Sequence, residues 1–177
     1  PWSDQRLGGS ATRQVPRRAD VTQQRMATQE RRVRAIELGP LGAHVLWAST
    51  LWEPSGYADE ARSLITALTA RGTRISARSL KPEVPGFRER VPVEQRRILA
   101  AVEANRGAKP LVAVTHGLPC DFQRGPIPDF FIGRGMFETD SLPPSWVDAC
   151  NTQDEIWVPT TFNQDSFAHA GVRVPLI

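Results

Sequence analysis

Apolar positions follow two alternating patterns from residue 44 to the end of the chain. Short apolar runs, of which His44–Ser49 is the first, are typical of strands buried on both faces of a sheet. After this run, Ala61, Leu64 and Ile65 lie at the i, i+3, i+4 spacing of a helix with one buried face. The sequence predicts strands at residues 44–49, 74–79, 111–115 and 155–158, and an extended piece at 129–137. It predicts helices at residues 58–71, 92–106, 143–151 and 161–170.

The order of these elements predicts the fold class. A strand, a helix and a second strand follow one another within residues 44–79, and such a unit implies a parallel pair joined by a right-handed crossover. Five strands alternating with helices predict an α/β fold, a Rossmann-like open parallel sheet with helices on both faces. The last helix opens on a capping-box sequence, Thr161-Phe162-Asn163-Gln164, and has Gly171 as its stop signal.

The first 38 residues lack this pattern and carry the positive charge. They hold eight arginines against four acidic residues, whereas residues 39–177 hold fourteen basic and fifteen acidic side chains, so the net charge of +3 is the sum of +4 and −1. We expect residues 1–38 to form a basic, flexible extension with at most a short helix, and residues 39–177 to form one domain. The alternative for the extension is a basic arm that touches lipid headgroups or RNA. With no aromatic residue there beyond Trp2, nucleic acid is not an expected partner.

Composition argues against several other classes of protein. Cys120 and Cys150 are too few for a zinc site or a dense disulfide framework, which favours a reducing, cytoplasmic compartment. No apolar stretch approaches the roughly 20 residues of a membrane-spanning helix, and no secretory signal is recognisable. The spacing of histidines and carboxylates predicts no metal site, and we expect no cofactor. Pro1 and Ile177 look like cut ends, so we expect a fragment of a longer protein.

Two loops at predicted strand ends hold candidate binding residues, because ligands of open parallel sheets bind outside the carboxyl ends of the strands. Ser55, Gly56 and Tyr57 follow the first strand and lead into a helix, whose N-terminus favours phosphate or carboxylate. The alternative is an ordinary tight turn. His116 follows the third strand, where it can serve as a base or stabilise developing charge. A purely structural role is the alternative, and it is the role we expect for the other two histidines.

A third loop, residues 133–140, concentrates two glycines, a cation and two carboxylates. Arg134, Glu138 and Asp140 are its candidate binding residues, because carboxylates accept hydrogen bonds from sugar hydroxyls. On extended backbone, Glu138 and Asp140 would lie on one side. The alternative is a solvated loop in which Arg134 pairs with a neighbouring acid.

Two segments carry a resemblance to a known family. The early segment resembles the opening loop and first helix of bacterial retaining glycosyltransferases of the two-Rossmann-domain (GT-B) type, family 4. Its matching residues are Ser55-Gly56-Tyr57, Glu60-Ala61-Arg62, Leu68 and Arg71-Gly72. A later segment is similar, in order and spacing, to the end of the first domain of that family. Its matching residues are 132–140, Pro143, Trp146-Val147, Cys150-Asn151, 154–159, Phe162-Asn163, Phe167 and Gly171-Val172. The resemblance covers about residues 42–177.

This resemblance implies the N-terminal half of a glycosyltransferase, without the C-terminal nucleotide-sugar domain. In such enzymes the first domain mostly holds the acceptor, here a glycan or a lipid-linked acceptor, and the second holds the nucleotide-sugar donor. The resemblance implies that Gly56 lies near the donor phosphates, although many members have a glycine pair where this chain has Ser55-Gly56. It implies that His116 is a catalytic residue that contacts the transferred sugar. Glu138 and Asp140 would either bind substrate or brace the cleft.

The implied transfer is metal-independent, with helix N-termini and cations stabilising the departing diphosphate. We expect no turnover by this chain alone. One alternative is a non-catalytic sugar- or protein-binding module derived from the same domain, and a lesser one is a related two-domain sugar-nucleotide epimerase. The basic extension would bring the protein to the inner face of the membrane as a peripheral contact.

Overall fold

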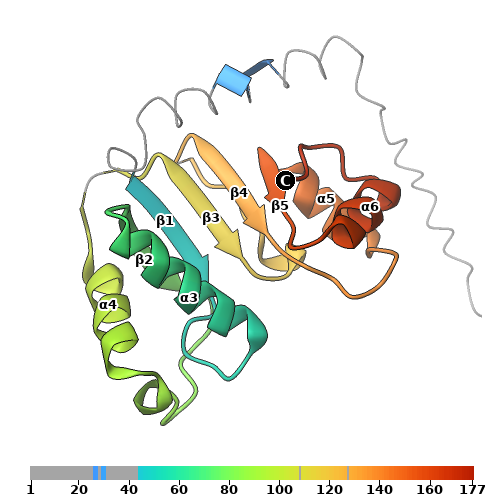
Figure 1. Cartoon of the computed structure of the whole chain (residues 1–177). Helices are drawn as coiled ribbons and strands as arrows, with labels where there is room; N and C mark the ends of the chain where they lie inside the picture. Colours follow the sequence, from blue (N-terminus) through green and yellow to red (C-terminus); the bar gives the residue numbers. More distant parts are fainter. Residues whose placement is uncertain (1–25, 28, 31–43, 108, 127) are drawn as a thin grey trace, which may run out of the picture.

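The computed structural model describes residues 26, 27, 29, 30, 44–107, 109–126 and 128–177, and their centre is a five-stranded parallel sheet (Figure 1). The strand order is β2-β1-β3-β4-β5. The strands are β1 (His44–Ser49), β2 (Arg74–Ser79), β3 (Val112–His116), β4 (Phe130–Arg134) and β5 (Glu155–Trp157). The helices of this region are α3 (Gly56–Ala70), α4 (Val93–Ala104), α5 (Pro144–Asn151) and α6 (Thr161–Ala170), with short 3-10 turns η1 (Arg88–Arg90) and η2 (Pro119–Asp121). The expected α/β, Rossmann-like fold is confirmed.

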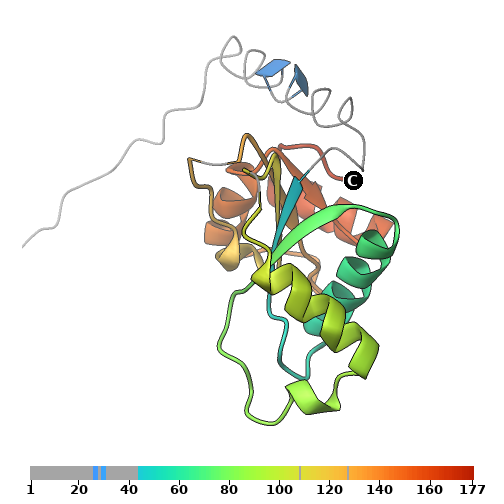
Figure 2. The ribbon, with the colours of Figure 1, turned by 90° about the vertical axis from the view of Figure 1, so that its left-hand side faces the viewer.

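Each side of the sheet has its own hydrophobic core, because successive residues of a strand face opposite sides. On one side Trp47, Val114 and Ile132 lie next to one another across β1, β3 and β4 and belong to a core shared with α3 and α4. On the other side Ile156 of β5 belongs to a second core. This core includes Phe122, which directly follows η2, Val147 and Cys150 of α5, and Phe167 of α6. Figure 2 shows the sheet from its β2 edge, with α3 to one side of it. Helices therefore cover both faces of the sheet.

Hydrogen-bonded caps define the starts of the first and last helices. The first helix begins at Gly56, two residues earlier than expected, since the Ser55 hydroxyl accepts a hydrogen bond from the Ala58 amide at 3.2 Å. In the last helix the cap is Thr160, whose hydroxyl accepts from the Asn163 amide at 3.2 Å. The capping-box prediction, which placed the cap at Thr161, is therefore wrong by one residue, while the stop at Gly171 is confirmed by its left-handed φ of 105°.

Two other boundaries are set by contacts with neighbouring elements. The second helix ends at Ala104 rather than residue 106, and the Asn105 side chain then donates to the backbone carbonyl of Ile75 at 2.8 Å. Of the extended piece expected at 129–137, only Phe130–Arg134 forms a strand. The pairing ends there because β5, the neighbouring strand, ends at Trp157 opposite Arg134.

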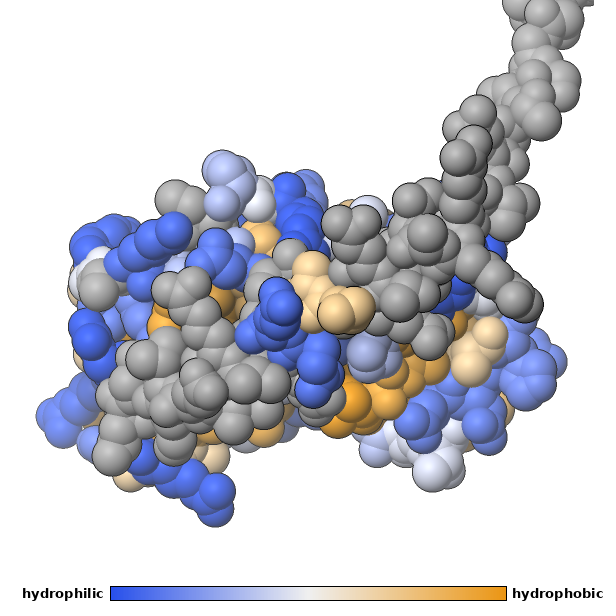
Figure 3. All heavy atoms as spheres, turned by 90° about the horizontal axis from the view of Figure 1, so that it is seen from above, coloured by the Kyte–Doolittle hydropathy of each residue, from blue (hydrophilic) through white to orange (hydrophobic). Residues whose placement is uncertain are grey.

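The expectation for residues 1–38 lies outside the described residues, except for residues 26, 27, 29 and 30, which are helical. Among the helices that the structure describes, none has the length and apolar character required to cross a membrane. Figure 3 looks onto the molecule from above, where hydrophilic residues form much of the described surface around smaller apolar areas.

Candidate functional site

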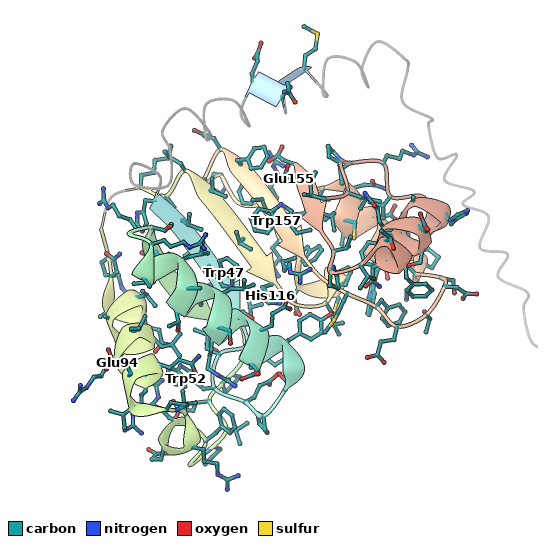
Figure 4. All side chains as sticks on the ribbon, in the orientation of Figure 1. Trp47, Trp52, Glu94, His116, Glu155 and Trp157 are labelled. Carbon is teal, nitrogen blue, oxygen red and sulfur yellow. The ribbon has the colours of Figure 1, made fainter. Side chains whose placement is uncertain are left out.

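The strand order places a topological switch point at the carboxyl ends of β1 and β3. From β1 the chain moves outward to β2 on one side and later returns to β3 on the other, and ligands of such sheets bind at this switch point. Ser49 and His116, the last residues of the two strands, are direct neighbours in the register. Figure 4 shows His116 at the end of β3, close to α3 and to Trp47.

Glu60 is the centre of a charged cluster at this switch point. One of its oxygens, Oε2, lies 3.0 Å from Nε2 of His116, and the other, Oε1, accepts a hydrogen bond from the Arg134 guanidinium. A second Arg134 nitrogen donates to the backbone carbonyl of Trp157 at 3.4 Å. The cluster thus joins α3 to the ends of β3 and β4, since Glu60 is 56 residues from His116 and 74 residues from Arg134 in the sequence.

Burial determines the protonation state of His116. The side chain has 0% exposure, and this burial lowers the pKa of His116 to about 4, although the Glu60 carboxylate acts in the opposite direction. The imidazole is therefore neutral at pH 7. Because its Nε2 faces a carboxylate, we place the single ring proton on Nε2, where it is donated to Glu60.

Tyr57 closes the cluster on the side of α3. Its hydroxyl donates to the Met136 carbonyl at 2.7 Å and accepts from the Met136 amide at 3.1 Å. Its ring lies edge-on to His116, with 5.7 Å between the ring centroids, and burial raises the pKa of Tyr57. Tyr57 therefore ties the start of α3 to the loop that follows β4.

Three buried polar atoms at the switch point have no hydrogen-bond partner within the described part of the chain. They are Nδ1 of His116, Oγ of Ser49 and Nε1 of Trp47. The Trp47 and His116 rings are themselves in edge-on contact, with centroids 5.9 Å apart. Unsatisfied buried groups are uncommon in folded proteins, so this concentration marks the corner as unusual.

The residues predicted for the first loop have separate roles. Ser55 is the helix cap, and its hydroxyl also donates to Glu53 at 2.8 Å. A Cβ added at Gly56 would have no atom within 4 Å, so the backbone there is open to an approaching group. Tyr57 belongs to the cluster around His116.

The residues predicted for the third loop are divided between the cluster and the surface. Arg134 lies in the cluster and pairs with an acid, as the solvated-loop alternative supposed, but it is buried rather than solvated. Glu138 and Asp140 are exposed in a bend after β4, and neither has a recorded contact with the cluster in the described region. Extended backbone, on which their alignment was predicted, is not found at 138–140.

The two glycines of the third loop serve packing. A Cβ at Gly133 would lie 2.5 Å from the Phe122 ring and 2.7 Å from Ile156. At Gly135 it would lie 3.1 Å from the Gly117 carbonyl oxygen. The absence of side chains at these positions therefore allows the segment after β3 to pack against β4.

Glu60 was missed as a site residue by reasoning from individual loops. The available signal was its position one helical turn after Gly56, because side chains of a helix point back toward its N-terminus. Nothing in the local sequence indicated that its partners would be His116 and Arg134.

No other feature of the described residues competes with this cluster as a site for the predicted chemistry. A groove of about 470 Å³ runs beside β2, and its lining includes His44, Ser76, Arg78 and Asn105 but no predicted site residue. Polar side chains that line this groove form hydrogen bonds with one another and with the backbone. The His44 ring lies 2.7 Å from the Ser76 hydroxyl, which donates to the Asn105 carbonyl at 2.9 Å. Within the described residues, no three His, Cys, Asp or Glu side chains are grouped so that they could hold a metal ion.

Comparison with known proteins adds no assignment. No family model, no curated protein and no solved structure matches the chain.

Proposed function

We propose that this chain is the first, mainly acceptor-side domain of a retaining, metal-independent glycosyltransferase. Such an enzyme transfers a sugar from a nucleotide-sugar donor to a glycan or lipid-linked acceptor. One observation carries the proposal: the two segments that resemble the family are in contact at the switch point of the sheet. Glu60 of the early segment contacts Arg134 of the later one, and Tyr57 exchanges two hydrogen bonds with Met136.

The geometry suits the two halves of such a reaction. The open backbone at Gly56 and the first amides of α3 can face a departing diphosphate, because helix N-termini favour anions. The cluster of Glu60, His116 and Arg134 lies one turn further along the helix, where it can orient the sugar. Glu138 and Asp140, which are exposed after β4, remain candidates for the acceptor side.

The rest of the enzyme would be supplied by other parts of the parent protein. The nucleotide would be held by a second domain, so the 177-residue chain alone would have no turnover. The basic residues 1–38, at +4, would add a peripheral contact with the anionic inner face of the membrane.

A non-catalytic sugar-binding module is the second candidate, and burial favours it. His116 has no exposed surface, and Arg134 is 10% exposed, so neither reaches a ligand directly in this arrangement. A module needs only a recognition surface, whereas an enzyme of this type also requires the donor to be held against it.

The test is a transfer assay on the parent protein. The reading frame is extended beyond Ile177 and expressed, and release of nucleoside diphosphate is measured with a panel of UDP-, GDP-, ADP- and dTDP-hexoses. We expect release by the extended protein in EDTA, no release by residues 1–177, and a loss of at least about tenfold in the His116→Leu variant, whereas Glu94→Gln, at an exposed position on α4, serves as the control. A reading frame that ends without a second domain, or an extended protein that releases nothing, would favour the module instead.

A further inference from the structure

Exposure distinguishes the three members of the cluster. One third (33%) of the Glu60 side chain is exposed, compared with 0% for His116 and 10% for Arg134. The two buried groups each contact a different oxygen of the carboxylate. Glu60 is therefore the member of the cluster that a dissolved molecule can reach.

We propose that the Glu60 carboxylate contacts the substrate, and that His116 and Arg134 are positioning residues that hold it. This inference rests on the proposed function and names its sugar-binding group. It also revises the role expected for His116, which acts through Glu60 rather than on the sugar itself.

The hydrogen-bonding capacity of Glu60 indicates what it binds. A carboxylate has about four acceptor positions, and one donor on each oxygen leaves about two unfilled. A carboxylate has no hydrogen to donate, so the group that fills these positions must be a hydrogen-bond donor, such as a hydroxyl. Two neighbouring hydroxyls of one sugar ring can satisfy both oxygens.

The charge of the surroundings indicates a neutral partner. The charges of Glu60 and Arg134 offset each other, and His116 is neutral. Asp121 is also close, because a Cβ on Gly117 would lie 2.9 Å from its carboxylate and because its charge acts on Tyr57. The corner around Glu60 therefore carries a negative excess, which disfavours phosphate and favours an uncharged sugar.

The position of Glu60 on α3 is consistent with this division. Glu60 is four residues from Gly56, which corresponds to roughly 6 Å along the helix axis. One sugar phosphate can span this distance, with its phosphate at the helix N-terminus and its hydroxyls at Glu60.

The test is a titration of the isotope-labelled 177-residue protein with glucose, mannose and galactose, and separately with inorganic phosphate, followed by NMR. We expect at least one hexose to shift the amide signals of residues around Glu60 and Gly117 in a saturable manner. Phosphate should leave the signals of Glu60 unchanged. Because a bond to a charged acceptor is stronger than one to a neutral amide, Glu60→Gln should weaken hexose binding by about fivefold or more.

Variants of His116 separate positioning from direct contact. His116→Gln retains an N–H group near the place of Nε2, so it should bind hexose within about threefold of the native protein, whereas His116→Leu should lose as much as Glu60→Gln. Glu94→Gln, an exposed position on α4 whose partner Arg97 is exposed as well, is the control and should change nothing. Peak dispersion reports whether each variant folds, and Glu60→Asp, which keeps the charge but shortens the side chain, replaces a variant that does not.

The inference is overturned if no hexose binds, if Glu60→Gln and Glu60→Asp both bind like the native protein, or if His116→Gln is as defective as His116→Leu. Hexose binding that depends on Glu60, combined with an inactive extended protein, would retain the inference and reject the transferase. Transfer activity of the extended protein that is unchanged by substitution of Glu60 would support the transferase and reject the inference.

Discussion

The glycines of this domain differ in the space around them, and this difference predicts a graded series of stabilities. Gly56, Gly135 and Gly133 all have backbone conformations that alanine can adopt, since among the described glycines positive φ occurs only at 72, 86 and 171. Alanine substitutions at the three positions therefore add no backbone strain, and their effects come from packing and, at Gly56, from helix propensity. The expected order of melting temperature is Gly56→Ala, then Gly135→Ala, then Gly133→Ala.

The magnitudes follow from the contacts. At Gly133 the new methyl would lie 2.5 Å from Phe122 and 2.7 Å from Ile156, which are 5% and 0% exposed and cannot move into solvent. Overpacking of this kind costs about 3 kcal/mol, or roughly 12 °C in a domain of this size. At Gly135 the closest atoms lie at 3.1 and 3.3 Å, so we expect a cost of about 1 kcal/mol. At Gly56 there is no contact, and alanine in a helix stabilises by up to about 1 kcal/mol relative to glycine.

The assay is thermal and urea unfolding of the three variants, followed by circular dichroism. Equal melting temperatures for Gly133→Ala and Gly56→Ala would refute the packing of Phe122 against β4. A loss at Gly56 comparable with that at Gly133 would instead place a close neighbour over the start of α3.

Three further outcomes are expected. His116 has a pKa near 4 in the folded protein and 6.5 ordinarily, so the unfolded chain binds more protons between these values and stability falls as the pH is lowered through this window. Between pH 7 and pH 4 the free energy of unfolding of the native protein should fall by about 3 kcal/mol more than that of His116→Gln. If urea unfolding gives the same difference between the two proteins at both pH values, this expectation is contradicted. Thr160→Ala should cost about 1 kcal/mol and Thr161→Ala almost nothing, as measured by urea unfolding, and the opposite order would restore the capping-box prediction. Asp154 is 2% exposed, accepts from the Phe131 amide at 2.8 Å and lies 3.0 Å from Arg124, whose side chain is 32% exposed, so Asp154→Ala should cost about 2 kcal/mol, chiefly through the unpaired Phe131 amide; a loss below about 0.5 kcal/mol would contradict this hydrogen bond.

The strands and helices could be predicted because their signals are local. The predicted bounds of the first two strands, 44–49 and 74–79, agree with the structure, since an apolar run and its flanking turn residues lie within a few positions of one another. The parallel arrangement followed from the alternation of strands with helices. His116 was singled out for the same reason, as a polar residue at the end of an apolar strand.

The composition of the candidate site required the tertiary structure. Glu60 and Arg134 are 74 residues apart, and their contact depends on β1, β3 and β4 lying in that order in the sheet. The role of Gly133 could not be predicted from the sequence either. A glycine that leaves room for a ligand and one that leaves room for a Phe ring look the same in the sequence. Local patterns along the chain therefore determined which segments form strands and helices. Only the packing of distant segments decided which polar side chains meet, because burial and charge pairing depend on neighbours in space.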